Sequence, residues 1–365
     1  TVTNGIIIGG AGTLNGTFNL SSGTVVTDGI TLGDAAGTLA NTLTQTGGSL
    51  TVNGNVTINQ PAGLVNGTTN TWNINAGTPT VSGLISFAGV NTASRIGRIV
   101  ITTGTLNANG GISFAGTTPA NKVIDMSTGG GTGTINLKGA LTGANVATLT
   151  AGTSGSIFNY ADNTTAQTVN FFGAGAYHNL HINTTGGVGA TLAAAITAGN
   201  VTGNLRVQSG TLSNGGFAIT GNASRTLEVA NAAFLKLGGT TSAFPTGFGT
   251  NTLGVSSTVD YNGSGNQTIS AQNYGNLTTS LNGTRTVTLS NSGTIGVAGA
   301  FSPAAGTTSY INTSSTVNFN GTSGSQNVPA FDFNNLTINN TSGVTLTGNA
   351  SVNGTTNALT FTNGK

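Results

Sequence analysis

The sequence predicts an all-β protein folded as a parallel β-solenoid, also called a β-helix. Three observations carry this prediction: apolar and polar residues alternate in short segments, turn-forming residues separate those segments, and phrases of sequence recur along the chain. Only 4% of the 365 residues are charged, against about 25% in ordinary soluble domains. A stack of similar coils with small, neutral outer residues accounts for all of these features.

The alternation predicts strands with one apolar face. Val56 and Ile58 flank Thr57, and Val317 and Phe319 flank Asn318. Residues i and i+2 share a face of a strand, so each such triplet points its apolar side chains inward and its polar one outward. Pairs that tolerate positive φ and mark turns lie between the triplets: Gly47-Gly48, Asn53-Gly54, Asn109-Gly110, Asn214-Gly215 and Asn353-Gly354. No stretch has a helical period.

The number of coils follows from their expected length. With roughly 20 residues in each coil, the chain would form about 18 coils. The alternative fold is a string of tandem β-sandwich domains in which the repeats are hairpin pairs. We favour the solenoid because no segment has the composition of an interdomain linker.

A change of repeat type divides the chain near residue 150. Residues 1–150 carry Gly-Thr-Leu or Gly-Thr-Val phrases, such as Gly104-Thr-Leu106, and we expect an N-terminal solenoid section there. Residues 151–365 carry a different phrase, aromatic-x-Asn-Leu, and we expect a C-terminal solenoid section there. The two sections are either two coil types or two joined domains.

The aromatic-x-Asn-Leu phrase occurs three times, at Tyr177–Leu180, Tyr274–Leu277 and Phe333–Leu336. A second phrase, Thr258–Gly263, recurs 58 residues later as Thr316–Gly321. We predict that the aromatic residue and the Leu point into the core and that the Asn serves a turn or a hydrogen-bonded ladder. The aromatic position takes Tyr or Phe and the next position takes His, Gly or Asn. The phrase therefore indicates architecture rather than an active site.

These repeats resemble those of a known group of proteins. The clearest copy, Phe333–Gly348, joins the aromatic-x-Asn-Leu phrase to Thr-Ile-Asn, Val-Thr-Leu and a turn. It is similar to the β-strand repeats of large secreted or cell-surface, often adhesin-like, proteins of Bacteroidota. The resemblance covers about Ser156 to Lys365. It implies a structural role outside a bacterial cell and no catalytic residues.

Few residues suggest chemistry, and we expect the protein not to be an enzyme. The carboxylates are far apart in sequence and are expected to be solvated turn or strand residues: Asp28, Asp34, Asp125, Asp162, Asp260, Asp332 and Glu228. A polysaccharide-acting β-helix enzyme that brings acids together from neighbouring coils is the third hypothesis for function. His178 and His181, three residues apart, fall on opposite faces of a strand and cannot share one ion there. Arg95 and Arg98 are expected to be solvated turn residues.

No cofactor, metal, nucleic-acid or membrane partner is predicted. The chain has no cysteine, which removes disulfides and thiolate metal sites. The net charge of +2 rests on nine basic and seven acidic residues, too few to indicate nucleic-acid binding. No apolar run is long enough to cross a membrane.

The two ends of the chain suggest self-assembly. Thr1–Gly10 and Ala358–Thr362 are equally apolar and uncharged, and natural proteins cap or charge such edge strands to prevent growth. We predict a structural protein that polymerises head to tail into an extracellular or cell-surface filament through terminal strands. The predicted assembly residues are Ile6, Ile7, Ile8, Leu359 and Phe361.

The alternative function is a monomeric adhesin stalk that binds glycans or surfaces. Its candidates for stacking on sugars are Trp72, Tyr160, Tyr177, Tyr261 and Tyr274. Tyr261 and Phe319 exchange at one repeat position, as do Tyr274 and Phe333. Core positions therefore suit these rings better than a sugar platform that needs a hydroxyl.

Overall fold

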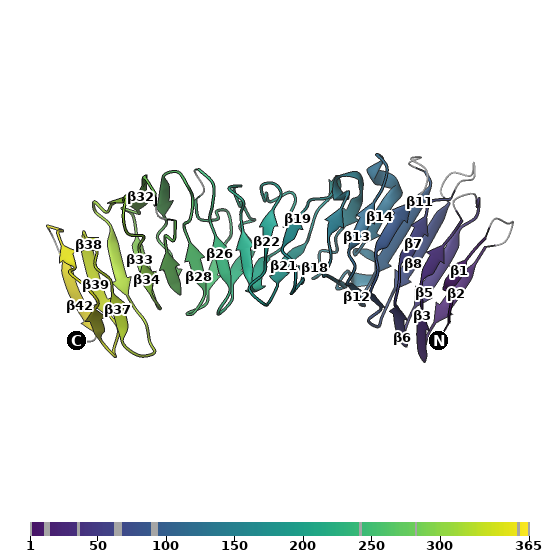
Figure 1. Cartoon of the computed structure of the whole chain (residues 1–365), viewed down its shortest axis with the longest axis horizontal. Helices are drawn as coiled ribbons and strands as arrows, with labels where there is room; N and C mark the ends of the chain where they lie inside the picture. Colours follow the sequence, from purple (N-terminus) through teal and green to yellow (C-terminus); the bar gives the residue numbers. More distant parts are fainter. Residues whose placement is uncertain are drawn as a thin grey trace. The chain divides into compact units, whose positions relative to one another are not determined.

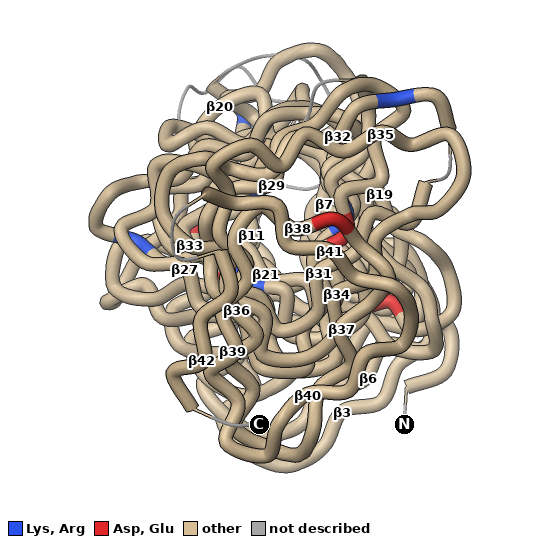
Figure 2. The backbone as a smooth tube through the Cα atoms, turned by 90° about the vertical axis from the view of Figure 1, so that its left-hand side faces the viewer, with Lys and Arg blue, Asp and Glu red and all other residues tan. Residues whose placement is uncertain are grey.

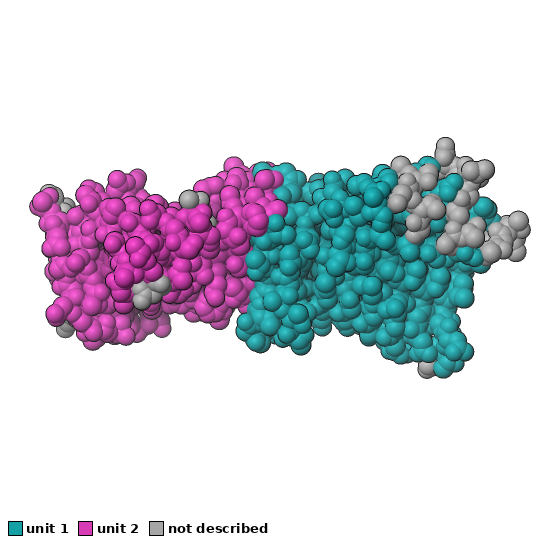
Figure 3. Space-filling view, turned by 45° about the horizontal axis from the view of Figure 1, so that its top comes forward, with its two compact units in different colours: residues 1–193, 198–204 teal, residues 194–197, 205–365 magenta. Residues whose placement is uncertain are grey.

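The fold is a β-solenoid, as the sequence predicts. A computed structural model describes residues 2–10, 15–34, 37–61, 68–88, 94–240, 243–281, 283–355 and 358–363. The chain is nearly all β and 3% helical, and its parallel strands stack into a solenoid of about 14 turns (Figure 1). Contacts divide the chain into two compact units (Figure 3): unit 1 comprises residues 1–193 and 198–204, and unit 2 comprises residues 194–197 and 205–365.

Unit 1 is built from three parallel sheets. The first contains β1 (Ile6–Ile8), β4 (Ile30–Leu32), β7 (Val56–Asn59), β10 (Ile85–Ala88), β13 (Ile112–Phe114) and β16 (Leu141–Thr142). The second contains β2 (Thr17–Leu20), β5 (Asn41–Gln45), β8 (Thr69–Ile74), β11 (Ile96–Ile101), β14 (Lys122–Asp125), β17 (Thr148–Thr150) and β20 (Ala174–Gly175). The third contains β3 (Thr24–Thr27), β6 (Ser49–Val52), β9 (Thr80–Val81), β12 (Thr105–Ala108), β15 (Thr134–Leu137), β18 (Ile157–Tyr160) and β21 (Asn179–Asn183).

A strand pair and three short helical turns complete unit 1. The pair is β19 (Gln167–Val169) with β22 (Gly189–Leu192), and the 3-10 turns are η1 (Pro119–Asn121), η2 (Thr128–Gly130) and η3 (Ala144–Val146). Parallel pairing continues across residue 150, where β15 pairs with β18 and β17 with β20. The boundary predicted near residue 150 therefore remains a prediction that the type of repeat changes there.

Unit 2 is also built from parallel strands that stack from coil to coil. One sheet contains β23 (Leu205–Ser209), β25 (Thr226–Val229) and β27 (Thr250–Leu253), and the next contains β24 (Thr211–Ser213), β26 (Phe234–Lys236), β28 (Thr258–Asp260), β31 (Asn276–Thr278) and β34 (Phe301–Ser302). Two more contain β29 (Gln267–Ile269), β32 (Arg285–Leu289) and β35 (Thr308–Ile311), and β30 (Asn273–Tyr274), β33 (Thr294–Val297), β36 (Thr316–Phe319), β39 (Asn335–Asn339) and β42 (Leu359–Asn363). Two strand pairs remain: β37 (Gln326–Val328) with β40 (Val344–Leu346), and β38 (Asp332–Phe333) with β41 (Ser351–Val352).

Coil length differs between the units and explains the number of turns. In unit 1, Val56 pairs with Ile85, 29 residues further along the chain. In unit 2 the spacing is shorter, from 18 residues between Thr258 and Asn276 to 24 between Thr226 and Thr250. The predicted 18 coils assumed roughly 20 residues throughout, which lies within the range of unit 2 but is too short for unit 1.

The core consists of side chains stacked from coil to coil. In unit 1, Val56 faces Ile85 and Ile58 faces Phe87, and all four are at most 1% exposed. Burial of each such side chain contributes roughly 1.5–3 kcal/mol. The rings considered as a sugar platform are also at most 1% exposed, which confirms that they are core residues: Trp72, Tyr160, Tyr177, Tyr261 and Tyr274.

The aromatic-x-Asn-Leu phrase closes one coil onto the previous one. Its Leu pairs with an apolar residue of the preceding coil in each copy: Leu180 with Phe158, Leu277 with Val259, and Leu336 with Val317. The aromatic residues and the Leu are buried, as predicted. The Asn joins adjacent coils: Asn276 Oδ1 accepts the Ala300 N–H at 2.9 Å.

Charged residues are sparse along the backbone, as Figure 2 shows. Among the residues that the structure describes, no helix has the length and apolar character needed to cross a membrane.

Candidate functional site

The candidate site is the pair of edge strands that carry the predicted assembly residues. β1 is one such strand, and within the described residues it pairs only with β4. The Ile6 N–H donates to the Gly29 carbonyl at 2.9 Å, and the Gly33 N–H donates to the Ile8 carbonyl at 2.8 Å. Bonding alternates along a parallel strand, so the N–H and C=O of Ile7 point toward the open edge.

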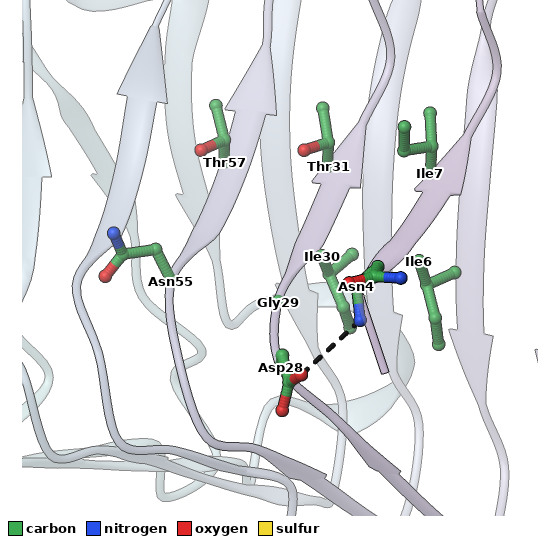
Figure 4. A pocket seen from close by; sticks show the side chains of 10 residues that line it. Asn4, Ile6, Ile7, Asp28, Gly29, Ile30, Thr31, Asn55 and Thr57 are labelled. Carbon is green, nitrogen blue, oxygen red and sulfur yellow. Dashed lines mark hydrogen bonds between the residues drawn. The ribbon is translucent and has the colours of Figure 1, made fainter. Parts of the chain in front are cut away.

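The side chains of β1 fall on two faces. Ile6 and Ile8 continue core rows, because they pair with Ile30 and Leu32. Ile7 points outward instead and is 73% exposed. Figure 4 shows Ile7 in line with Thr31 and Thr57 on the next two strands. Ile7 thus ends an outward row that is otherwise made of hydroxyl side chains.

A shallow hollow of about 530 Å³ lies beside this edge. Asn4 and Asp28 line this hollow, and the Asn4 N–H donates to Asp28 Oδ2 at 3.4 Å, the bond drawn dashed in Figure 4. Asn4 has a positive φ of 76°, a conformation that Asn tolerates better than most residues. The chain enters β1 through this turn.

β42 is the second edge strand, and within the described residues it pairs only with β39. Leu359 pairs with Leu336 and Phe361 with Ile338, so both continue core rows. Leu336 and Ile338 are 4% and 2% exposed, whereas Leu359 and Phe361 are 51% and 58% exposed. Among the described residues, no further strand covers these core rows at β42.

The two edges are not equivalent, although the sequence suggests that they are. Ile8 is only 4% exposed at the β1 edge, and a bridge from Val2 covers Thr27 of β3. At the β42 edge, Leu346 of the neighbouring β40 is 62% exposed. Core rows are therefore more exposed at the β40 and β42 edge than at the β1 edge, where the strongly exposed Ile7 points outward.

The carboxylates form structural contacts, and three of them are buried rather than solvated as expected. Asp125 pairs with Arg98, and Asp260 accepts hydrogen bonds from the N–H and hydroxyl of Ser280 at 2.9 and 2.6 Å. The third, Asp162, accepts the Thr164 N–H at 2.8 Å. Asp162 and Asp260 thus each accept a backbone N–H, from Thr164 and Ser280 respectively.

Asp125 shows how such a group stays ionised. Burial alone raises its pKa, but hydrogen bonds from Ser127, Arg98 and Thr128 outweigh burial and hold the pKa below its usual value. Arg98 lies within β11, so the expectation of a solvated turn residue is wrong for it. Lys122, on the next strand, is fully buried, and burial lowers the pKa of its ammonium.

The histidines lie apart from any metal-binding cluster. His178 is 5% exposed and lies just before β21, while His181 lies on the outward face of β21. No group of three possible metal ligands occurs among the residues that the structure describes.

A repeated glutamine clamp is the feature that sequence reasoning missed. Gln326 Oε1 accepts the Gly321 N–H at 2.7 Å, and its Nε2 donates to the Val297 and Gly299 carbonyls at 2.9 and 2.8 Å. Gln167 and Gln267 make the corresponding bonds in their own copies. Each of these glutamines lies six or seven residues after the aromatic residue that ends the preceding strand region. This spacing is the signal that could have identified the clamp in the sequence.

Comparisons with family models, with curated proteins and with solved structures find no match to this chain. The assignment of a role therefore rests on the geometry of the edges and outer faces.

Proposed function

We propose that the chain is a structural subunit of an extracellular or cell-surface filament, joined head to tail by pairing of β1 of one copy with β42 of the next. The observation that carries the proposal is the exposure of Leu359 and Phe361, which occupy core rows yet are more than half exposed. A further parallel strand would cover both.

The composition of β1 suits this role. If its inward residues Ile6 and Ile8 lie on Leu359 and Phe361, then Ile7 lies opposite Thr360 on the outer face. Burying two large apolar side chains contributes roughly 3–6 kcal/mol, and each new backbone hydrogen bond adds about 1 kcal/mol. Association costs several kcal/mol in lost freedom, so assembly should depend on protein concentration.

The location outside a bacterial cell, and a structural rather than enzymatic role, rest on the resemblance to Bacteroidota surface repeats. The low charge supports self-association as well, because copies of the chain repel one another little. Other copies are the proposed partner.

The test uses edge variants that leave existing bonds intact. Ile7→Pro removes an N–H that points to the open edge and none that reaches β4, and Phe361→Glu places a charge on the open core row. We expect filaments of the unmodified chain in negative-stain micrographs, and single particles for both variants. Val255→Glu is the matched control, because Val255 is 64% exposed in a turn outside β1 and β42.

Two results would refute the proposal. One is an unmodified chain that stays monomeric in sedimentation at high concentration. The other is filaments that persist in both edge variants, which would place the contact elsewhere.

A monomeric adhesin stalk that binds glycans is the second candidate function. A polar groove on the outer face of unit 1 favours it, and that groove is independent of the edge strands.

A further inference from the structure

A groove of about 420 Å³ lies on the outer face of the third sheet of unit 1. One row of side chains crosses its floor, with one residue from each successive strand: Thr80, Asn107, Asn136 and Asn159. A second row beside it includes Asn109 and Lys138. We call this hollow the amide groove.

Hydrogen bonds hold the first row in one orientation. Asn159 Nδ2 donates to Asn136 Oδ1 at 3.0 Å, and Asn136 Nδ2 donates to Asn107 Oδ1 at 2.9 Å. Asn107 Nδ2 then donates to Thr80 Oγ1 at 3.3 Å. Strands in a sheet are about 4.8 Å apart, so the row presents polar groups at that interval over about 14 Å.

The row keeps bonding capacity on its exposed side. A side-chain amide offers two N–H donors and two acceptor lone pairs. Within the row, Asn107 and Asn136 each donate one N–H and accept through one lone pair. Each therefore retains one N–H and one lone pair. The carbonyl oxygens of Asn109 and Asn159 have no donor among the described residues. A buried acceptor without a donor costs about 1–3 kcal/mol.

We propose that the amide groove binds an extended, hydroxyl-rich glycan that lies across successive coils. A sugar hydroxyl both donates and accepts, as the retained groups of the amide row do. The retained N–H groups and lone pairs of Asn107 and Asn136 bond the sugar hydroxyls, and rotation of the Asn109 amide turns its unpaired carbonyl oxygen toward a sugar donor. The five buried rings take no part, so the proposed glycan contacts are hydrogen bonds to amides rather than stacking on aromatic rings.

Other ligand classes fit the groove less well. A nucleic acid needs several cations for its phosphates, and Lys138 is the single charged residue among those that line the groove. An extended peptide adds to a free strand edge, whereas β12 and β15 are each paired on both sides. Neutral glycans and uronic-acid glycans both offer hydroxyl groups to the amide row. Only a uronic acid also carries a carboxylate, which Lys138 can bind, so Lys138 distinguishes the two classes.

The experiment measures binding of two probes to the full chain by titration calorimetry: cellohexaose, which is neutral, and the hexamer of galacturonic acid. Binding of at least one probe is expected. Asn136→Ala should weaken it about tenfold, the equivalent of one or two hydrogen bonds. Thr80→Val, which keeps the side-chain shape, should weaken it less. Lys138→Gln should weaken binding of the galacturonic acid hexamer alone.

Asn73→Ala is the matched control. Asn73 also points outward from a central strand of unit 1 and donates to Thr44 Oγ1 at 3.3 Å, but it lies outside the groove. It should leave the Kd unchanged, and thermal unfolding should show equal stability of the two Asn variants. The proposal is overturned if neither probe binds, or if N136A and N73A weaken binding equally. Neither outcome bears on filament formation, because the edge strands are untouched.

Discussion

Two copies of the same repeat in unit 2 bury a similar pair of aromatic rings but differ in the polar groups around it. The tyrosine copy spans residues 258–289 and the phenylalanine copy spans residues 316–346. Each closes one coil with the same pairing, and each buries two aromatic rings whose centroids are 6.4 and 6.2 Å apart, respectively. In the tyrosine copy the hydroxyls of Tyr261 and Tyr274 also lie 2.8 Å apart.

The backbone explains which aromatic residue each copy carries. The Ser270 N–H donates to the Tyr261 hydroxyl at 3.2 Å, and the Tyr274 hydroxyl donates to the Ser270 carbonyl at 2.8 Å. Pro329 occupies the corresponding place in the phenylalanine copy, and proline has no N–H to donate. The hydroxyl and its backbone donor are therefore present together or absent together.

The polar group that supports the glutamine clamp also differs. Arg285 Nη1 donates to Gln267 Oε1 at 2.7 Å in the tyrosine copy. Asn340 Nδ2 donates to Gln326 Oε1 at 3.0 Å in the phenylalanine copy. Ring volume and the glutamine are common to both copies, whereas the hydroxyls and the guanidinium are not. The common features are therefore the ones that the coil requires.

Removing a shared ring should have the largest effect. Phe333 is fully buried against Phe331 and Phe319, so Phe333→Ala should destabilise unit 2 by about 3–5 kcal/mol. Denaturant unfolding measures the change. Phe217→Ala, at a ring that is 39% exposed, should cost much less. Equal costs would show that the ring pair is not a core element.

Removing the shared glutamine should come next and should distinguish the copies. Gln267→Leu leaves the Gly263 N–H and the buried Arg285 guanidinium with fewer partners, and we expect a cost of about 3 kcal/mol. Gln326→Leu leaves only neutral groups and should cost about 2 kcal/mol. Unfolding curves give both values, with Gln208→Leu as the exposed control. A larger cost for Gln326→Leu would contradict the role of Arg285.

High pH should lower the stability of the tyrosine copy and leave that of the phenylalanine copy unchanged. Burial raises the pKa of Tyr261 to about 12, and burial also raises the pKa of Tyr274. A raised folded-state pKa means that stability is complete below the ordinary value of about 10 and falls as the pH rises through about 12. The Y261F/Y274F variant should lose less stability over this range, as circular dichroism at each pH would show.

The same logic applies to unit 1, where burial raises the pKa of both Tyr160 and Tyr177. A Y160F/Y177F variant should remove a separate part of the alkaline loss. If neither double variant changes the alkaline transition, the buried hydroxyl pairs do not cause it.

Exchanging single aromatic residues should have the smallest effect. Phe319→Tyr places a hydroxyl where Pro329 provides no N–H, and we expect a cost of about 1–2 kcal/mol. Phe319→Leu at the same site controls for disturbed packing. A neutral F319Y variant would show that the hydroxyl finds another donor and that Pro329 does not decide the residue.

The sequence predicts the fold because the repeat and the alternation are local signals. The inward ring and Leu of the phrase follow from the period of a strand, and the structure confirms them. The glutamine clamp was missed because Gln167, Gln267 and Gln326 bond to carbonyl groups 29 or 30 residues earlier in the chain. Coil length was underestimated in unit 1, because turn length is not visible in a strand pattern.

The candidate edges were only partly predictable. The residues of β1 and β42 were identified from their composition, but their unequal exposure depends on what covers each core row. Leu359 is 51% exposed and Ile8 only 4%. The amide groove could not be predicted either, because Asn107, Asn136 and Asn159 come together only through the register of three strands.

Cysteine cross-linking tests head-to-tail pairing most directly, because the chain has no cysteine of its own. If Ile6 and Ile8 lie on Leu359 and Phe361, residues 7 and 360 of neighbouring copies lie within the roughly 4.4–6.8 Å Cα separation that a disulfide spans. The oxidised I7C/T360C variant should give a ladder of covalent multimers on a denaturing gel, and each single variant should give dimers at most. Monomers and dimers alone from the double variant would contradict the pairing of β1 with β42.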